Sequence, residues 1–275
     1  MNMSSGISGR GWLNFLSVIP LVIALACALF SPAWAAEPKP EPKPSFEITT
    51  KMFDGTVLLD PQIQTDQALA ANCVAEGKKW VEQYRSDAAK ERKQPDAFIG
   101  GGWYVERSYD VRSVVGNRYV SIVRNDATMT GGAHPDLDLD TILWDRTAGK
   151  RISIRPFFNE TADGGPTLQF LAASIIATVK IAKKARFDGD DSDTDWIKNI
   201  QPTLRKLGSV TLTPSTDAGK SSGLTFHYAA TALGVHAEGG YVAFVPWEQL
   251  KPYLTPEGVA IFGGARPKGD DDDLE

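Results

Sequence analysis

The chain contains few of the residues from which metal centres and disulfide frameworks are built. It has 2 cysteines and 3 histidines among 275 residues. Two cysteines exclude a scaffold held together by many disulfides. The histidines, His134, His227 and His236, do not stand at the spacing of a zinc-binding helix. We therefore assign no metal, no cofactor and no catalytic residue from the sequence.

An excess of basic residues is also missing. Lys and Arg number 29 against 34 Asp and Glu, which gives a formal net charge of -5 and a pI of about 5.3. A general electrostatic attraction to nucleic acid is therefore not expected. The rest of the composition, 42% hydrophobic and 23% charged, is that of an ordinary folded protein.

The longest apolar run is short. It covers residues 18–30 and is too brief to cross a bilayer as a stable helix. Because Arg10 precedes it and Ala33-Trp34-Ala35 follows it, the pattern predicts a signal peptide over residues 1–35 that is cleaved near Ala35. The mature protein would then be periplasmic or secreted, without a transmembrane helix and with a net charge of -6. An uncleaved membrane anchor over residues 12–30 is the alternative.

The segment after the predicted cleavage point is rich in proline. In residues 36–45, prolines alternate with Lys and Glu, a pattern that favours an extended polyproline II spacer. An inert N-terminal tail explains the pattern equally well. Either interpretation places the start of the folded part near residue 46.

One cysteine, Cys73, remains after the predicted cleavage. It stands in the region 64–93, where Leu69, Cys73, Gly77 and Trp80 recur at spacings of three and four, as on the buried side of an amphipathic helix. A reactive thiol would need a basic neighbour and access to solvent, and the sequence shows neither. We therefore predict a thiol packed in the core.

The order of the predicted elements indicates an α+β fold. Asp54-Gly55 and Gly116-Asn117 are typical of tight turns between antiparallel strands, and Pro166 is a favourable first residue for a second long helix. A short helix is expected at 195–204. Because a helix and a cluster of strands occur twice, we predict a mainly antiparallel sheet with helices packed on one side and two closely packed subdomains. The expected parts are residues 46–154, residues 155–262 and an acidic, solvated tail over 263–275.

Two regions of the sequence resemble a known family. The first is the Thr-Gly-Gly-Ala-His-Pro run at 130–135, and the second comprises the strand-like segments 224–228 and 241–246 around the glycines of 234–240. Together they resemble the RsiV-like exported domain family, which is the extracytoplasmic region of the lysozyme-sensing anti-sigma factor RsiV and an accessory module of some peptidoglycan deacetylases. The resemblance implies an α+β fold, export and binding of lysozyme.

The resemblance does not extend to the other parts of those proteins. Only eleven residues precede Trp12, so we expect no sigma-binding segment. Phe53-Asp54-Gly55 lacks one acidic residue of a deacetylase metal motif, and no paired-histidine segment follows it. The similarity is therefore to the accessory module alone.

The candidate binding residues surround the glycine pair of the first region. If residues 137–141 form a strand, its period of two places three carboxylates on one face beside a histidine. Such a group could bind a cation or supply acid and base groups to a glycan. The alternative is that the histidine fixes its own turn while the acids face solvent. The candidates are Gly131, Gly132, His134, Asp136, Asp138 and Asp140.

A second acidic segment, residues 188–195, superficially has the composition of a calcium loop. If Asp191 is taken as position 1, position 6 is Trp196 instead of glycine and position 12 is Pro202 instead of glutamate. A solvated loop before a helix fits better. His236-Ala237-Glu238 has the His-x-Glu pattern of zinc deaminases, but the cysteine pair that completes such a site does not follow it.

These observations leave three functions open. The first is an exported binding or sensing module whose partner is a basic protein such as lysozyme, or peptidoglycan, because an acidic surface attracts a basic protein. The second is an enzyme that acts on cell-wall glycan through His134 and the neighbouring carboxylates. The third is a structural envelope protein. The sequence favours the first and does not decide whether the protein is an enzyme.

Overall fold

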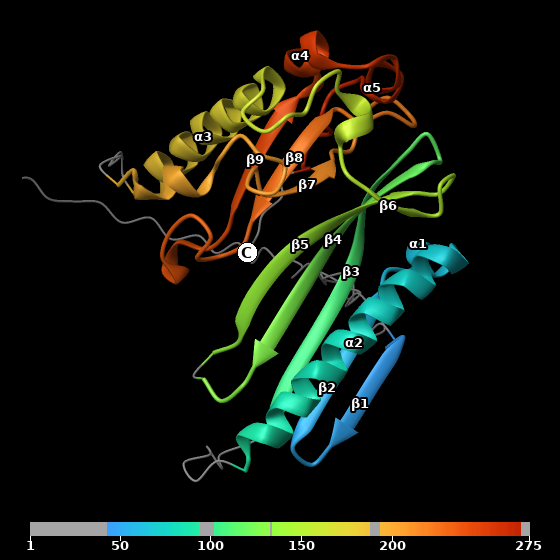
Figure 1. The fold of residues 1–275 in the computed structure, drawn as a ribbon, viewed down its shortest axis with the longest axis vertical. Coiled ribbons are helices and arrows are strands. Elements are labelled where there is room, and N and C mark those ends of the chain that lie inside the picture. Colours follow the sequence, from blue (N-terminus) through green and yellow to red (C-terminus); the bar gives the residue numbers. More distant parts are fainter. Residues whose placement is uncertain (1–42, 94–101, 133, 188–192, 271–275) are drawn as a thin grey trace, which may run out of the picture. The chain divides into compact units, whose positions relative to one another are not determined.

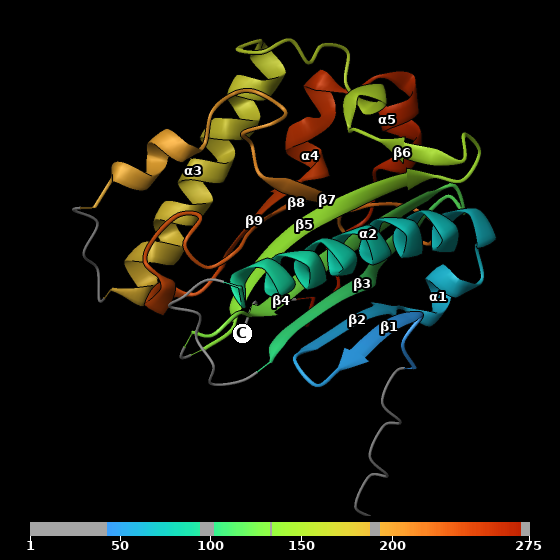
Figure 2. The same ribbon diagram turned by 60° about the horizontal axis from the view of Figure 1, so that its bottom comes forward.

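The computed structural model describes residues 43–93, 102–132, 134–187 and 193–270 (Figures 1 and 2). The predicted signal peptide, residues 36–42 of the proline-rich spacer and residues 188–192 of the acidic loop lie outside this part. Residues from Glu41 onward form one compact unit with a six-stranded and a three-stranded sheet. This arrangement confirms the α+β class. Within the described ranges, none of the helices has the length and apolar character needed to span a bilayer.

The six-stranded sheet has its strands side by side in sequence order. All neighbouring strands are antiparallel except β2 and β3, which are parallel and are connected by a helix that crosses the sheet. The strands are β1 (Phe46–Thr50), β2 (Phe53–Leu59), β3 (Trp103–Val115), β4 (Tyr119–Met129), β5 (Asp136–Asp145) and β6 (Lys150–Ile152).

A short helix α1 (Pro61–Gln64) and the long helix α2 (Gln67–Glu91) follow β2, and α2 covers one face of the sheet (Figure 2). Gly77 allows the close approach, because a Cβ there would stand 2.7 Å from a methyl group of Val57. Cys73 is fully buried, and burial raises the pKa of its thiol to about 12. The prediction of a thiol packed in the core is confirmed.

The first hairpin turns three residues earlier than predicted. Thr50 pairs with Phe53, so the turn is Lys51-Met52, and Asp54 and Gly55 lie inside β2. Gly55 is needed for packing instead of for a turn, since a Cβ at this position would lie 2.5 Å from Val81 of α2. The second hairpin is confirmed, because both turn residues adopt left-handed angles, with φ of 57° at Gly116 and 54° at Asn117.

The three-stranded sheet carries the second long helix on one face. Helix α3 (Pro166–Arg186) begins at the predicted proline and buries Leu168, Leu171 and Ile175. The strands are β7 (Ser209–Leu212), β8 (Gly223–Tyr228) and β9 (Tyr241–Pro246), and α4 (Trp247–Leu250) and α5 (Pro256–Ile261) follow them. The helix predicted at 195–204 is only a short 3-10 turn, Asp195–Asn199, and α5 was not predicted.

Strand β7 attaches the small sheet to the large one through side-chain to backbone hydrogen bonds. The Leu212 amide donates to Ser121 Oγ at 2.9 Å, Ser113 Oγ donates to the Leu212 carbonyl at 2.6 Å, and the Val210 amide donates to Thr141 Oγ1 at 2.8 Å. Hydrophobic residues form one core between α2 and the large sheet and a second core around α3. A boundary near residue 155 stays a prediction.

The C-terminal segment packs against the large sheet. The Asp270 carboxylate accepts hydrogen bonds from Arg112 at 2.6 and 2.7 Å and from Arg266 at 2.8 Å. Burial alone would raise the pKa of Asp270, but these two guanidinium groups hold it below its usual value. The prediction that Asp270 is solvated is therefore wrong, while residues 271–275 lie outside the described part of the chain.

His227 of β8 is expected to make the fold sensitive to acid. The ring is 3% exposed, and its Nε2 lies 2.8 Å from Thr211 Oγ1. Burial, together with the charges of Arg112 and Arg266, lowers its pKa to about 4 from the usual histidine value of about 6.5. The unfolded chain therefore binds the proton more readily, so the free energy of unfolding should fall between pH 6.5 and about 4, by roughly 3 kcal/mol in total.

Urea unfolding across this pH range tests the prediction, with His227→Gln as the control because glutamine keeps a hydrogen-bonding side chain and does not titrate. The difference in unfolding free energy between the two proteins should change with pH only in this window. Parallel pH profiles would show that His227 is not responsible.

Candidate functional site

A cleft of about 540 Å³ lies between the ends of β3, β4 and β5 and the connection from β8 to β9, residues 229–240. In Figure 2 this connection lies beside the hairpin that joins β4 to β5. Apolar groups of the lining include Leu137, Leu139 and Ala229. The polar groups at the cleft include Glu106, Ser108, Asn125, Asp138 and His236.

The alternation of strand residues places Glu106, Ser108 and Asn125 on the cleft side of the sheet. On β3, Val105, Arg107 and Tyr109 face α2, so Glu106 and Ser108 between them face the opposite side. Pairing of Ser108 with Asn125, and of Asn125 with Leu139, continues this row across three strands. The cleft therefore has an amphipathic floor with a carboxylate at one side.

His134 stands at the edge of the cleft. Its ring centroid is 4.8 Å from that of His236, although 102 positions separate the two residues in the sequence. His134 Nδ1 also lies 3.3 Å from the carbonyl oxygen of its neighbour Pro135. Gly131, with φ of 110°, and Gly132 are exposed in the preceding turn. The structure thus brings His134 into contact with His236 of the β8 to β9 connection.

The three predicted aspartates lie on β5 and are exposed. Asp138 lines the cleft, and its Oδ1 accepts a hydrogen bond from the Leu139 amide at 2.9 Å. Asp140 accepts from the Thr141 amide at 2.8 Å and from Ser209 Oγ at 3.0 Å. Among the described residues, no three histidine, cysteine or acidic side chains converge in a way that could hold a metal ion.

Sequence reasoning missed the wall of the cleft that the β8 to β9 connection forms. The Glu238 carboxylate anchors this segment, because it accepts hydrogen bonds from Lys183 Nζ and Tyr241 Oη, each at 2.6 Å. Burial alone would raise the pKa of Glu238, but these hydrogen bonds hold it below its usual value. The sequence His236-Ala237-Glu238 in a glycine-rich connection gives no indication that the glutamate pairs with a lysine of α3.

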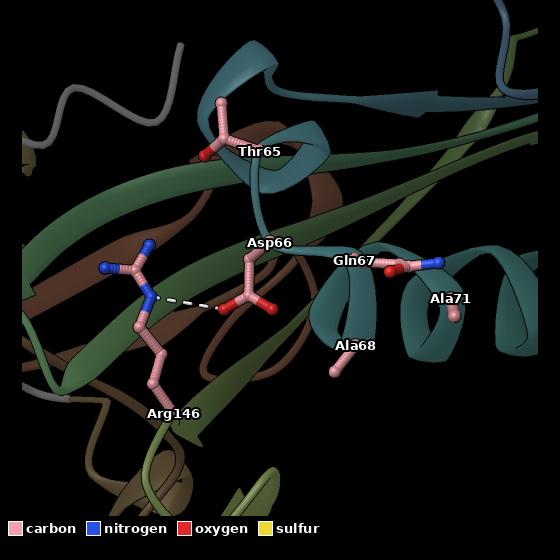
Figure 3. A pocket seen from close by; sticks show the side chains of 6 residues that line it. All are labelled: Thr65, Asp66, Gln67, Ala68, Ala71 and Arg146. Carbon is pink, nitrogen blue, oxygen red and sulfur yellow. Dashed lines mark hydrogen bonds and ion pairs between the residues drawn. The ribbon is translucent and has the colours of Figure 1, made fainter.

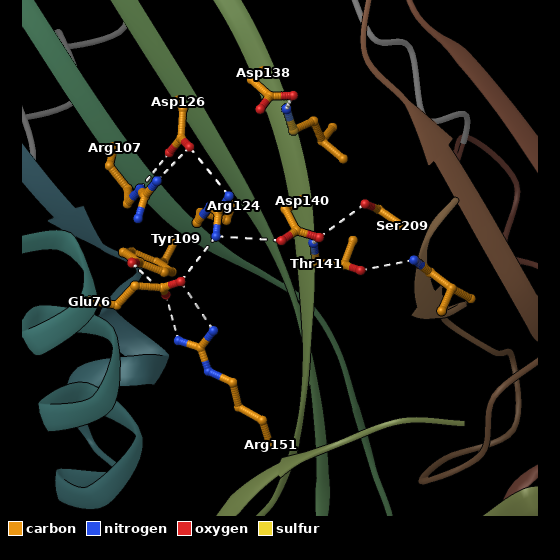
Figure 4. A network of polar contacts seen from close by, with 12 residues as sticks. Glu76, Arg107, Tyr109, Arg124, Asp126, Asp138, Asp140, Thr141, Arg151 and Ser209 are labelled. Atoms are coloured by element: carbon orange, nitrogen blue, oxygen red, sulfur yellow. Dashed lines mark hydrogen bonds and ion pairs between the residues drawn. The ribbon is translucent and has the colours of Figure 1, made fainter. Parts of the chain in front are cut away.

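A network of ionic contacts supports β4 and β5 from the α2 side (Figure 4). Arg107 donates to both carboxylate oxygens of Asp126 at 2.5 and 2.6 Å, and Arg124 lies 3.1 Å from Glu76 and 3.5 Å from Asp140. Burial would raise the pKa of Glu76, but hydrogen bonds from Arg151 and Tyr109 keep it below its usual value. These charges neutralise one another, so the network holds the strands in place and offers no open site.

A second hollow lies at the start of α2 (Figure 3). Its charged groups are Asp66, which accepts a hydrogen bond from the Leu69 amide, and Arg146, which donates to Asp66 at 3.2 Å. Both side chains already serve the helix terminus and the neighbouring turn. We therefore do not assign a ligand to this hollow.

Gly219-Lys220-Ser221-Ser222-Gly223 has the Gly-x-Ser-x-Gly spacing of a hydrolase nucleophile. The structure gives Ser221 a different role. It is fully buried, and its Oγ lies 2.9 Å from the Thr213 carbonyl oxygen and 2.7 Å from that of Gly223. The segment leads into strand β8 instead of a helix, so the serine fixes a turn.

Comparison with known proteins finds similarity only among solved structures. No protein-family model and no curated protein matches the chain. A DUF3298 family protein from Pseudomonas aeruginosa PAO1 is 19% identical, with a TM-score of 0.49 over 82% of this chain and 98% of that chain. A DUF3298 family member from Bacteroides fragilis is 16% identical, with a TM-score of 0.48 over 78% of this chain and 94% of that chain.

Proposed function

We propose that the protein is an exported, RsiV-like binding module that takes a positively charged protein such as lysozyme at the cleft beside β5. The observation that carries the proposal is the pair of carboxylates at the cleft. In the described part of the chain, Glu106 and Asp138 form no ion pair, whereas Asp126, which also lines the cleft, is neutralised by Arg107. Unpaired carboxylates next to an apolar floor suit a basic, partly apolar surface.

The cleft supports binding better than catalysis. A general acid or base must lie within hydrogen-bond reach of the proton that it transfers. His134 is next to the Pro135 carbonyl and His236, and Asp138 and Asp140 are occupied by backbone amides of their own strand. We therefore place the proposed partner, and no reaction, at this site.

Binding of the protein to lysozyme across a salt series tests the proposal. The affinity should be highest at low ionic strength and should fall steadily as salt is added. A variant with Glu106→Gln and Asp138→Asn should bind about tenfold more weakly at low salt, because each exposed charge contributes on the order of 0.5 to 1 kcal/mol.

A variant with Glu47→Gln and Asp163→Asn is the matched control. It removes the same charge from exposed positions outside the cleft and should bind almost as well as the unaltered protein. Absence of lysozyme binding at low salt would refute this partner. Soluble peptidoglycan fragments form the second arm, and binding of these fragments without sensitivity to salt would indicate an envelope glycan instead.

A further inference from the structure

The cleft is bordered by a strand edge that lacks a partner strand. Strand β5 pairs with β4 along its whole length. On its other side, β5 pairs with β6 only at Leu143, Trp144 and Asp145. Side chains and backbone of β7 reach Asp140 and Thr141. In the described part of the chain, the edge of β5 from Asp136 to Leu139 is therefore open.

The backbone groups along this edge point away from the sheet. The Leu139 amide donates to Asp138 Oδ1 at 2.9 Å, and the Thr141 amide donates to Asp140 Oδ1 at 2.8 Å, so neither is turned toward β4. Because alternate residues of a strand direct their backbone groups to the same side, the amide and carbonyl of Leu137 share this direction. Edges of this kind readily accept another strand.

The surroundings of the edge select the chemistry of the added strand. Asp136 and Asp138 are exposed beside it, and Glu106 lies across the cleft floor. Leu137, with 56% of its surface exposed, offers an apolar contact next to the cleft. An extended segment that alternates basic and apolar side chains complements these features, with its apolar side chains in the cleft.

We propose that an extended, positively charged segment of the partner adds to β5 as a further strand along residues 136–139. The inference rests on the proposed function, since it specifies how the basic partner is held. A cation of the added strand attracts the Asp138 carboxylate away from the Leu139 amide. The freed amide then donates to a backbone carbonyl of the partner, so one hydrogen bond replaces another and the carboxylate gains a counter-charge.

In the absence of the partner, the same carboxylate protects the edge. Asp138 covers an amide that would otherwise be available to any strand, and negative charges on an edge discourage pairing between copies of the chain. The cleft therefore favours a cationic strand over a neutral one.

The test measures, by calorimetry, the affinity of the full chain for a ten-residue peptide of alternating lysine and valine. Two further versions carry N-methyl groups on all valine amides or on all lysine amides, which blocks backbone pairing along one side of the peptide without changing its charge. We expect one methylated version to bind about tenfold more weakly than the unmethylated peptide, because it loses two backbone hydrogen bonds. The other version should retain binding.

Leu137→Pro removes an amide on the open edge, where proline is tolerated, and Leu137→Ala is its control because it keeps the amide. Only the proline variant should bind the methylated and unmethylated peptides with equal affinity. Urea unfolding of both variants verifies that the fold is retained. Equal affinity for all three peptides would overturn strand addition without contradicting the proposal of a basic partner. Binding of lysozyme but of no peptide would also overturn strand addition, whereas failure to bind lysozyme refutes the proposed function separately.

Discussion

Arg107→Met is expected to lower the free energy of unfolding by about 3 kcal/mol, because it leaves the buried carboxylate of Asp126 without its main counter-charge. The two side chains are only 4% and 7% exposed, and Arg107 donates two hydrogen bonds to this partner. Arg124, 3.4 Å from Asp126, compensates for part of the loss. Urea denaturation should show a lower midpoint with an unchanged m-value.

The double variant Arg107→Met with Asp126→Leu separates the ion pair from simple packing. A buried pair replaced by apolar side chains of similar size often retains stability, whereas loss of one partner alone is costly. The double variant should therefore be more stable than the single variant. Its Arg124 still contacts Glu76 and Asp140. A single variant that loses less than about 1 kcal/mol would contradict the assignment of a large penalty to the unpaired Asp126.

Lys183→Met is expected to have an effect of similar size, about 3 kcal/mol, and to loosen one wall of the cleft. Lys183 and Glu238 are 7% and 8% exposed, and the lysine also lies 5.0 Å from the ring centre of Tyr241. Without the ammonium group, the Glu238 carboxylate would remain buried with only neutral donors. Hydrogen exchange of residues 229–240 should become faster, and binding of lysozyme should weaken with it.

The control for this prediction is Lys180→Met, which removes an exposed lysine one turn earlier on the same helix. It should leave both the unfolding free energy and the exchange rates of the β8 to β9 connection nearly unchanged. If the two variants behave alike, the Lys183 contact with Glu238 does not anchor the cleft wall. The distinction matters because overall destabilisation alone would speed exchange throughout the protein, not at one segment.

Local sequence patterns identified the long helices and most strands. The repeat of Leu69, Cys73 and Gly77 predicted the buried side of α2, and Pro166 marked the start of α3. Such patterns depend on neighbours in the chain and are visible without tertiary structure. The turn predicted at Asp54-Gly55 was wrong, because a glycine that permits close packing against Val81 has the same sequence signature as a turn glycine.

The candidate site was only partly accessible to this reasoning. His134 and Asp138 were identified from their spacing, but their surroundings come from residues about one hundred positions away. Asp140 was grouped with them by the strand period, and the structure gives it contacts with Ser209 and Arg124 instead. Glu238 carried no local signal for its pairing with Lys183.

The sequence by itself determined most of the elements and the acidic character of the protein, because propensity, periodicity and charge are properties of the chain. The tertiary structure alone decided which acids remain unpaired and which strand edge stays open. Arg107 and Asp126 neutralise each other, while Glu106 and Asp138 line a cleft beside the β8 to β9 connection and, among the described residues, form no ion pair. The reason is physical: the consequence of a buried or exposed charge depends on its partners in space, and those partners belong to distant segments.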